Sequence, residues 1–129
     1  MSTAKPRILL VEDYDDARAM YSLFLVSKGF DVDEAATGEQ GLLSAGAHRP
    51  DLIVLDVGLP RMDGFEVARR LRMMPGFDAV PIIALSATTD HLTARARAAG
   101  CTQAIFKPCL PDELLAAIEA LLAARPTAR

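Results

Sequence analysis

The sequence has no apolar stretch long enough to cross a membrane, and the short run at residues 8–11 cannot form the core of a signal peptide. It also has no block of like charges, and its formal net charge is −3. These absences argue against a membrane protein, and against nucleic acid or an anionic membrane as an electrostatic partner. We therefore expect a cytoplasmic protein that does not bind nucleic acid or membranes directly.

Cysteine is scarce as well. Cys101 and Cys109 are the only two cysteines, and no paired Cys or His residues have the spacing of zinc ligands. This pattern argues against a zinc site. We expect both cysteines to be reduced residues that pack in the interior rather than a disulfide.

The length allows one ordinary domain. The chain has 129 residues, 51% of them hydrophobic, which is enough for a single core and too little for two. No repeat, linker or low-complexity tract divides it. We expect one domain over residues 1–129.

Short apolar runs alternate with segments of helical spacing. The runs lie at residues 7–11, 32–35, 51–55, 81–85 and 103–106, and each is predicted to be a strand. Apolar residues recur at helical spacing between them, as in Ala17, Tyr21 and Phe24. Because parallel strands need crossover connections, the alternation predicts an α/β fold with a doubly wound, five-stranded parallel sheet and five helices.

Several acidic residues have a local structural explanation. Asp15 and Asp16 are typical of the first turn of a helix, so we expect them to begin a helix rather than bind metal. Asp63 and Gly64 match a turn and a helix cap, and Thr37 begins a capping-box pattern.

Polar side chains follow four of the five predicted strands. Glu12 and Asp13 come after the first, Asp56 after the third, Ser86 after the fourth and Lys107 after the fifth. Because ligands of open α/β sheets bind beyond the carboxyl ends of the strands, we expect these groups to converge there. Carboxylates so close together repel one another, and some of them would have to take up protons unless a cation lay among them.

The donor set indicates which cation this is. Only carboxylate, carbonyl and water oxygens are available, which favours Mg²⁺, an ion that usually completes its coordination with phosphate oxygens and water. Asp56 follows a fully apolar strand and is the best candidate for a nucleophile. Lys107 and the Ser86 hydroxyl are placed to bind phosphoryl oxygens.

These motifs together resemble one family, the receiver domain of bacterial two-component response regulators. The resemblance covers about residues 7–123 and rests on the acidic pair, Asp56, the LPxxDG motif (Leu59, Pro60, Asp63, Gly64), Ser86–Ala87 and Lys107–Pro108. It implies a flavodoxin-like fold with strand order 2-1-3-4-5.

The resemblance also implies a function. Asp56 would receive a phosphoryl group from a phosphohistidine on a sensor histidine kinase or a histidine phosphotransfer protein. Mg²⁺ would be held by Asp13, Asp56 and the backbone carbonyl of Gly58, with Glu12 acting through water. Such a protein is a phosphorylation switch of protein contacts rather than a turnover enzyme, and the Ser86 hydroxyl would move inward on phosphorylation.

One position departs from the family pattern. The family usually has Tyr or Phe three residues before the lysine, where this chain has Ala104. We expect Phe106 to point to the opposite face of its strand and therefore not to replace that aromatic residue. The Lys107–Pro108 bond is one that can be cis.

Other functions share part of this pattern. Asp13 and Asp15 imitate the DxD motif of haloacid-dehalogenase-like phosphatases, although no second acidic pair follows a later strand. A flavin binder of this topology needs a phosphate loop where this chain is acidic. The chain could also be a receiver-like module that signals by binding without phosphorylation, and either a stand-alone protein or a piece of a longer one.

Overall fold

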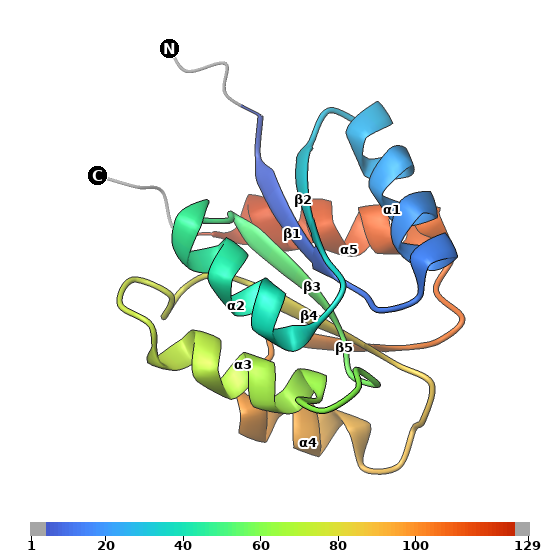
Figure 1. Ribbon diagram of the computed structural model, residues 1–129. Coiled ribbons are helices and arrows are strands. Elements are labelled where there is room, and N and C mark those ends of the chain that lie inside the picture. The colour runs from blue at the N-terminus through green and yellow to red at the C-terminus, as the bar shows by residue number, and fades with distance from the viewer. Residues whose placement is uncertain (1–4, 126–129) are drawn as a thin grey trace.

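The computed structural model describes residues 5–125, which form a single five-stranded parallel sheet with helices on both faces (Figure 1). The strands are β1 (Arg7–Val11), β2 (Asp31–Ala35), β3 (Leu52–Asp56), β4 (Ile82–Ser86) and β5 (Gln103–Phe106). The helices are α1 (Asp15–Ser27), α2 (Gly38–Ala47), α3 (Gly64–Met73), α4 (Leu92–Ala99) and α5 (Pro111–Ala124). The strand order β2-β1-β3-β4-β5 confirms the predicted doubly wound, flavodoxin-like fold.

The core has two layers, one on each face of the sheet. Side chains from α1 and α5, such as Leu25 and Leu114, pack on one face. Side chains from α2, α3 and α4, such as Ala45, Leu71 and Ala96, pack on the other. The central strands β3 and β4 are buried along their whole length, as expected for a parallel sheet covered on both sides.

Two strands extend one residue further than the apolar runs predict. Asp56 pairs in register with Leu85, and Ser86 pairs with Phe106, so each polar residue is the last of its strand instead of the first beyond it. The backbone explains this, because Val57 N–H donates to Leu85 O at 2.8 Å and continues the ladder past Asp56. The two side chains are therefore held by the sheet itself.

The predicted helix starts are confirmed. Asp15 and Asp16 lie in the first turn of α1, and the side chains of Thr37 and Asp63 cap α2 and α3. None of the helices within residues 5–125 is both long and apolar enough to span a membrane.

Arg72 is partly buried, unlike the exposed Arg69 and Arg70 of the same helix. Its guanidinium donates to the carbonyl oxygens of Phe77 at 2.6 Å, Val80 at 2.7 Å and Gly100 at 2.9 Å. Arg72 thus joins the end of α3 to the loops that precede β4 and β5. These carbonyls are remote in sequence, so helical spacing could not reveal the contact.

Candidate functional site

Three carboxylates meet at the carboxyl ends of β1 and β3. Single ligand oxygens of Glu12, Asp13 and Asp56 all lie within 4.8 Å of one another. Glu12 and Asp56 are only 2% and 6% exposed, whereas Asp13 is exposed. Glu12 N–H donates to Ala35 O at 3.0 Å, which holds the acidic pair against the end of β2.

Lys107 brings a positive charge to this cluster. Its Nζ atom lies 3.0 Å from Asp56 Oδ1 and 3.5 Å from Glu12 Oε1. The Lys107–Pro108 peptide bond is cis, in agreement with what the sequence permits. Just beyond it, the buried Tyr21 hydroxyl donates to Cys109 O at 2.6 Å, so α1 anchors the loop that carries the lysine.

The local charges affect two ionisable groups. Burial is the main cause of the raised pKa of Glu12, and the charges of Asp56 and Asp13 add to it, although Tyr14 N–H and Lys107 oppose it. Burial alone would lower the pKa of Lys107, but the Asp56 and Glu12 carboxylates outweigh it and the pKa is raised. The lysine is therefore charged near neutral pH.

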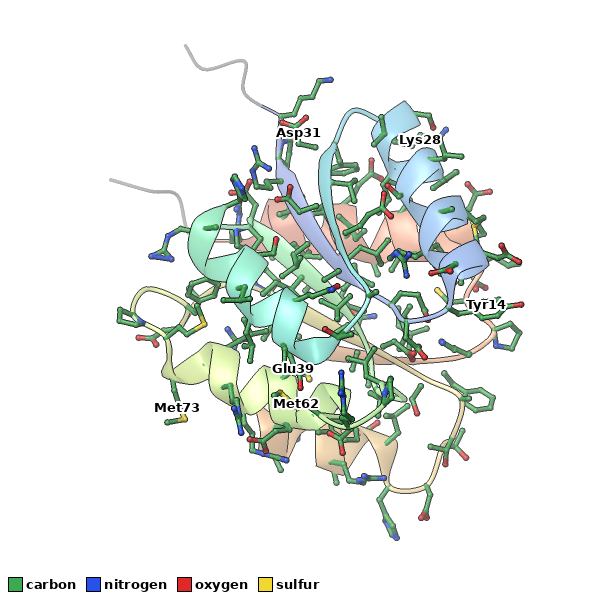
Figure 2. The ribbon with its side chains drawn as sticks, in the orientation of Figure 1. Tyr14, Lys28, Asp31, Glu39, Met62 and Met73 are labelled. Atoms are coloured by element: carbon green, nitrogen blue, oxygen red, sulfur yellow. The ribbon has the colours of Figure 1, made fainter. Side chains whose placement is uncertain are left out.

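Glu12 Oε2 and Oε1 have different surroundings. Oε2 accepts from Tyr14 N–H at 3.1 Å, while the Tyr14 ring points outward at the start of α1 (Figure 2). Among the buried side-chain nitrogen and oxygen atoms in the part of the chain that the structure describes, Oε1 alone has no hydrogen-bond partner. Burying an oxygen without a hydrogen-bond partner costs free energy. A bound cation or water molecule would provide the missing partner.

The donor chemistry of the cluster fits Mg²⁺. The oxygens come from three carboxylates, without sulfur or imidazole nitrogen, and one of them lacks a partner. The acidic cluster predicted from the strand ends is thus confirmed as a compatible site.

Ser86 lies at the end of β4 with its hydroxyl engaged. Ser86 Oγ donates to Thr88 O at 2.9 Å and accepts from Thr88 N–H at 3.1 Å. Gly58 N–H lies 3.4 Å from Asp56 Oδ1, and a Cβ at Gly58 would stand 4.0 Å from Asp56 Oδ2. With only hydrogen at position 58, space near Asp56 Oδ2 stays open.

Gly64 allows α3 to begin directly against the end of β3. A Cβ at this position would overlap Asp56 O and lie 2.7 Å from Val57 Cα. Gly64 N–H donates to Val57 O at 3.0 Å, and Asp63 Oδ1 accepts from Glu66 N–H at 3.0 Å. Asp63 therefore caps α3, and Gly64 lets this helix begin close to β3. Together they help to position Asp56.

Comparison with known proteins decides the family. The family model described as the response regulator receiver domain matches residues 8–119. The chain belongs to the response regulator receiver domain family.

The transcriptional regulatory protein AfsQ1 of Streptomyces coelicolor is 43% identical to this receiver domain over 118 residues, which are 91% of this chain and 51% of that protein. The DNA-binding response regulator MtrA of Mycolicibacterium smegmatis is 37% identical, over 95% of this chain and 53% of MtrA. The chain thus spans about half the length of these curated relatives.

Solved structures of similar proteins have the same fold. Chemotaxis protein CheY4 of Vibrio cholerae superposes with a TM-score of 0.87 at 33% identity, covering 92% of this chain and 99% of that one. The receiver domain of the sensor histidine kinase PA1611 of Pseudomonas aeruginosa gives a TM-score of 0.84 at 32% identity, covering 94% and 100%. The PA1611 receiver domain has a magnesium ion coordinated in its active site cleft.

The receiver domain keeps the other candidate residues away from the cluster. Asp15 pairs with Arg18 at 2.7 Å and its side chain is 85% exposed, which weakens a DxD interpretation. His48 and His91 lie exposed at helix ends. The role of the Gly58 carbonyl as a metal ligand stays a prediction.

Arg18 is a residue that sequence reasoning missed. Its guanidinium donates to Glu12 O at 2.9 Å and pairs with Asp15 and Glu34. It therefore holds the backbone of the acidic pair from the first turns of α1. Glu12 lies before the start of α1, so no helical spacing relates the two residues and the contact could not be read from the pattern.

The expectation for Phe106 was wrong. Ala104 packs against the core beneath α4, and Ile105 packs against the core beneath α1 and α5. Because side chains alternate along a strand, Phe106 lies on the same face as Ala104. The expectation overlooked that residues two apart share a face.

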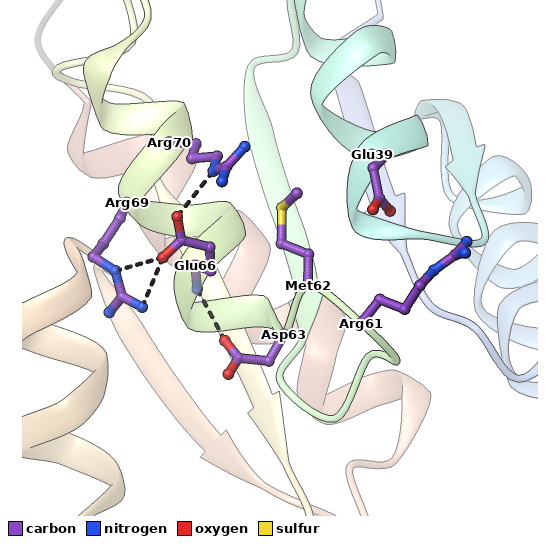
Figure 3. Close-up of a pocket in the computed structure, with 7 residues that line it drawn as sticks. All are labelled: Glu39, Arg61, Met62, Asp63, Glu66, Arg69 and Arg70. Carbon is purple, nitrogen blue, oxygen red and sulfur yellow. Dashed lines mark hydrogen bonds and ion pairs between the residues drawn. The ribbon is translucent and has the colours of Figure 1, made fainter.

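A pocket lined by other residues lies between α2 and α3 (Figure 3). Its volume is about 430 Å³, and it is lined by Glu39, Arg61, Met62, Asp63, Glu66, Arg69 and Arg70. Glu66 already pairs with Arg69 at 3.0 Å and with Arg70 at 2.9 Å. Asp56 and Lys107 do not line it, so this pocket is separate from the cluster at the strand ends.

Proposed function

We propose that Asp56 accepts a phosphoryl group from a phosphohistidine. The observation that carries this proposal is the contact of 3.0 Å between Asp56 Oδ1 and Lys107 Nζ inside the cluster of three carboxylates. Asp56 combines burial, a fixed place at the end of β3 and a cationic partner. These are the properties that a phosphoryl acceptor needs, since phosphoryl transfer depends on positioning and charge neutralisation.

The Oδ2 atom of Asp56 is the oxygen available to attack. Oδ1 already accepts from Lys107 and from Gly58 N–H, and the missing side chain at Gly58 leaves the approach to Oδ2 open. A P–O bond forms to Asp56 as the P–N bond of the donor breaks. The electron pair of that bond returns to the donor imidazole, and Lys107 compensates the charge that remains on the phosphoryl oxygens.

Asp13 and Asp56, with the carbonyl of Gly58, would hold Mg²⁺, and Glu12 would contact it through water. Bound there, the ion supplies positive charge that neutralises phosphoryl oxygens. Lys107 provides the same kind of neutralisation from beyond the end of β5, and it offsets the mutual repulsion of the Asp56 and Glu12 carboxylates when no metal is bound.

Ser86 converts phosphorylation into a change of surface. Its hydroxyl is held by Thr88, so it has to leave Thr88 O before it can donate to a phosphoryl oxygen on Asp56. This exchange gives the domain two arrangements of the β4–α4 loop, and phosphorylation biases the equilibrium between them.

The partners follow from this chemistry. The donor is a sensor histidine kinase or a histidine phosphotransfer protein, and the exchange takes place in the cytoplasm. Two relatives are named as regulators of transcription or DNA-binding proteins, but this acidic receiver region acts through protein contacts and does not itself bind nucleic acid. Each chain accepts one phosphoryl group and loses it by hydrolysis, without turnover of a substrate.

Intact mass spectrometry after incubation with acetyl phosphate tests the proposal. With Mg²⁺, the wild type is expected to gain one phosphoryl group, and Asp56→Asn is expected to gain none. Omitting Mg²⁺ should abolish the adduct in the wild type. An unmodified wild type in every condition would contradict the proposal and leave a module that signals by binding alone. Steady phosphate release without an adduct would instead indicate a phosphatase.

A further inference from the structure

The hydroxyl of Tyr21 joins α1 to the chain that follows Lys107. The Tyr21 side chain is 5% exposed and packs in the core beneath α1 and α5, together with Cys109 and Leu114. Its hydroxyl donates to Cys109 O at 2.6 Å, across 88 positions of sequence. A phenylalanine would fill the same space, so the specific contribution of tyrosine here is the hydrogen bond to this one carbonyl.

This hydrogen bond fixes the short segment that carries the lysine. Lys107 N–H donates to Ser86 O at 2.7 Å, where β5 ends beside β4. The next residue, Pro108, has no N–H to donate. Cys109 comes after it, and its carbonyl is held from α1 by Tyr21. The backbone around the lysine is thus fixed at its own N–H and again two residues later.

The place of the Lys107 ammonium group depends on this backbone. Nζ lies 3.0 Å from Asp56 Oδ1 and 3.5 Å from Glu12 Oε1, at the end of a flexible four-carbon side chain. If the backbone shifts, the ammonium group shifts relative to both carboxylates. Phosphoryl transfer depends on positioning, and a misplacement of about 1 Å can cost roughly a hundredfold in rate. A hydrogen bond two residues from Lys107 can therefore affect the reaction at Asp56.

The Tyr21 hydroxyl is suited to remain a donor. Burial is the main cause of its raised pKa, and the carboxylates of Glu12 and Asp56 add to it while Lys107 opposes it. The hydroxyl therefore stays protonated around neutral pH. Cys109 is 5% exposed, and a buried carbonyl without a donor costs free energy. Loss of the hydroxyl should therefore let this segment move.

We propose that Tyr21 is a positioning residue for Lys107. By fixing the carbonyl of Cys109, its hydroxyl places the ammonium group against the phosphoryl oxygens. The inference rests on the proposed phosphorylation of Asp56, and Tyr21 acts through the lysine without touching the phosphoryl group itself. Arg18, three residues earlier on the same helix, holds the backbone of the acidic pair. Helix α1 thus aligns both the carboxylates and the lysine that faces them.

The initial rate of adduct formation with acetyl phosphate and Mg²⁺, measured by intact mass, tests this role. Tyr21→Phe keeps the ring and should lower the rate by about tenfold, since a full misplacement of about 1 Å costs roughly a hundredfold. Ser27→Ala is the matched control, because Ser27 Oγ also donates to a carbonyl, Phe24 O, at 2.6 Å but at the far end of α1. Its rate should equal that of the wild type. An unchanged rate in Tyr21→Phe would overturn the inference.

A double-mutant cycle shows whether Tyr21 acts through the lysine. In the Lys107→Met background there is no ammonium group to place, so adding Tyr21→Phe should change the rate by less than about twofold. The same tenfold loss in both backgrounds would show that Tyr21 acts by another route, and the positioning role would be wrong.

A second measurement does not depend on phosphorylation. The chain has three lysines, so NMR of protein labelled with ε-¹³C-lysine resolves Lys107, and Lys107→Met assigns its resonance. In metal-free protein, Asp56→Asn should shift this resonance, because Nζ lies 3.0 Å from Asp56 Oδ1. In the Tyr21→Phe background the same substitution should shift it less. Equal shifts in the two backgrounds would show that the hydroxyl does not place the lysine.

The outcomes separate this inference from the proposed function. A wild-type adduct with an unchanged rate in Tyr21→Phe overturns the inference and leaves phosphorylation of Asp56 standing. No adduct in the wild type overturns the proposed function and with it the role of Tyr21 in phosphoryl transfer. Circular dichroism checks that each variant is folded, and sucrose, which favours the folded state, is added for a variant that is not.

Discussion

Lys107 Nζ lies 3.0 Å from Asp56 Oδ1, and the same ammonium group lies 3.5 Å from Glu12 Oε1. One cation from the end of β5 therefore compensates carboxylates that follow β1 and end β3. The arrangement makes the stability of the domain depend on the same residue that we assign to phosphoryl binding.

Removing this cation should destabilise the metal-free protein. Lys107→Met leaves the buried carboxylates of Glu12 and Asp56 without their positive partner, and we expect the free energy of unfolding to fall by about 1–3 kcal/mol. Urea denaturation in EDTA measures the loss. Lys5→Met, at an exposed position, should change stability by less than about 0.5 kcal/mol. Equal effects of the two substitutions would contradict the electrostatic role of Lys107.

Magnesium should stabilise the folded domain through Asp13. A ligand that binds only the folded state adds about 1.4 kcal/mol at roughly ten times its dissociation constant. Thermal unfolding of the wild type and of Asp16→Asn should show this gain, since Asp16 only begins α1. Asp13→Asn should lose most of it, and a full gain in this variant would exclude Asp13 as a ligand.

Glu12 should make the metal-free protein less stable as the pH rises. Its pKa is raised by burial and by Asp56 and Asp13, so the folded state holds the proton more tightly than the unfolded chain does. That contribution is fully present below the ordinary glutamate pKa and is lost as the pH rises through the raised value. Glu12→Gln imitates the protonated form, so its stability relative to wild type should increase from acid to neutral pH in EDTA.

Glu119→Gln is the matched control for this pH dependence, because Glu119 is exposed on α5. Its stability difference from wild type should stay small at all pH values. If the difference in stability between Glu12→Gln and the wild type did not depend on pH, the surroundings of Glu12 would not disfavour its ionised carboxylate.

Two glycines should respond in opposite directions to alanine. Gly64→Ala places a methyl group against Asp56 O and Val57 Cα, and overpacking of this kind costs roughly 1–3 kcal/mol. Gly46→Ala lies within α2 with an ordinary contact of 3.7 Å to Met74 Cε, and should gain about 0.5–1 kcal/mol. Urea denaturation of both variants checks the difference in sign. A neutral Gly64→Ala would mean that α3 need not begin so close to Asp56.

Much of the fold could be predicted because its signals are local. Apolar runs and helical spacing indicate strands and helices directly, and the convergence of strand ends brings Glu12, Asp56 and Lys107 together without any knowledge of side-chain contacts. The limits of β3 and β4 were missed by one residue, because hydrogen bonds to neighbouring strands extend the ladder into polar residues.

Contacts between segments remote in sequence could not be predicted in this way. Arg72 binds carbonyls at residues 77, 80 and 100, and no periodicity identifies those acceptors. A small hollow between α4 and β5, lined in part by Ala96 and Ala104, depends on how the helix packs on the strand, which only the structure gives. The face of β5 on which Phe106 lies could be predicted, because residues 104 and 106 share a face when side chains alternate along a strand.

The most direct test of the central claim is to locate the phosphoryl group. Borohydride reduces an aspartyl phosphate to homoserine with release of phosphate, and peptide mass spectrometry then identifies the modified position. After treatment with acetyl phosphate and Mg²⁺, we predict homoserine at position 56 alone. Homoserine at position 13 or 15, or none in protein that carries an adduct, would contradict the assignment of Asp56 as the acceptor.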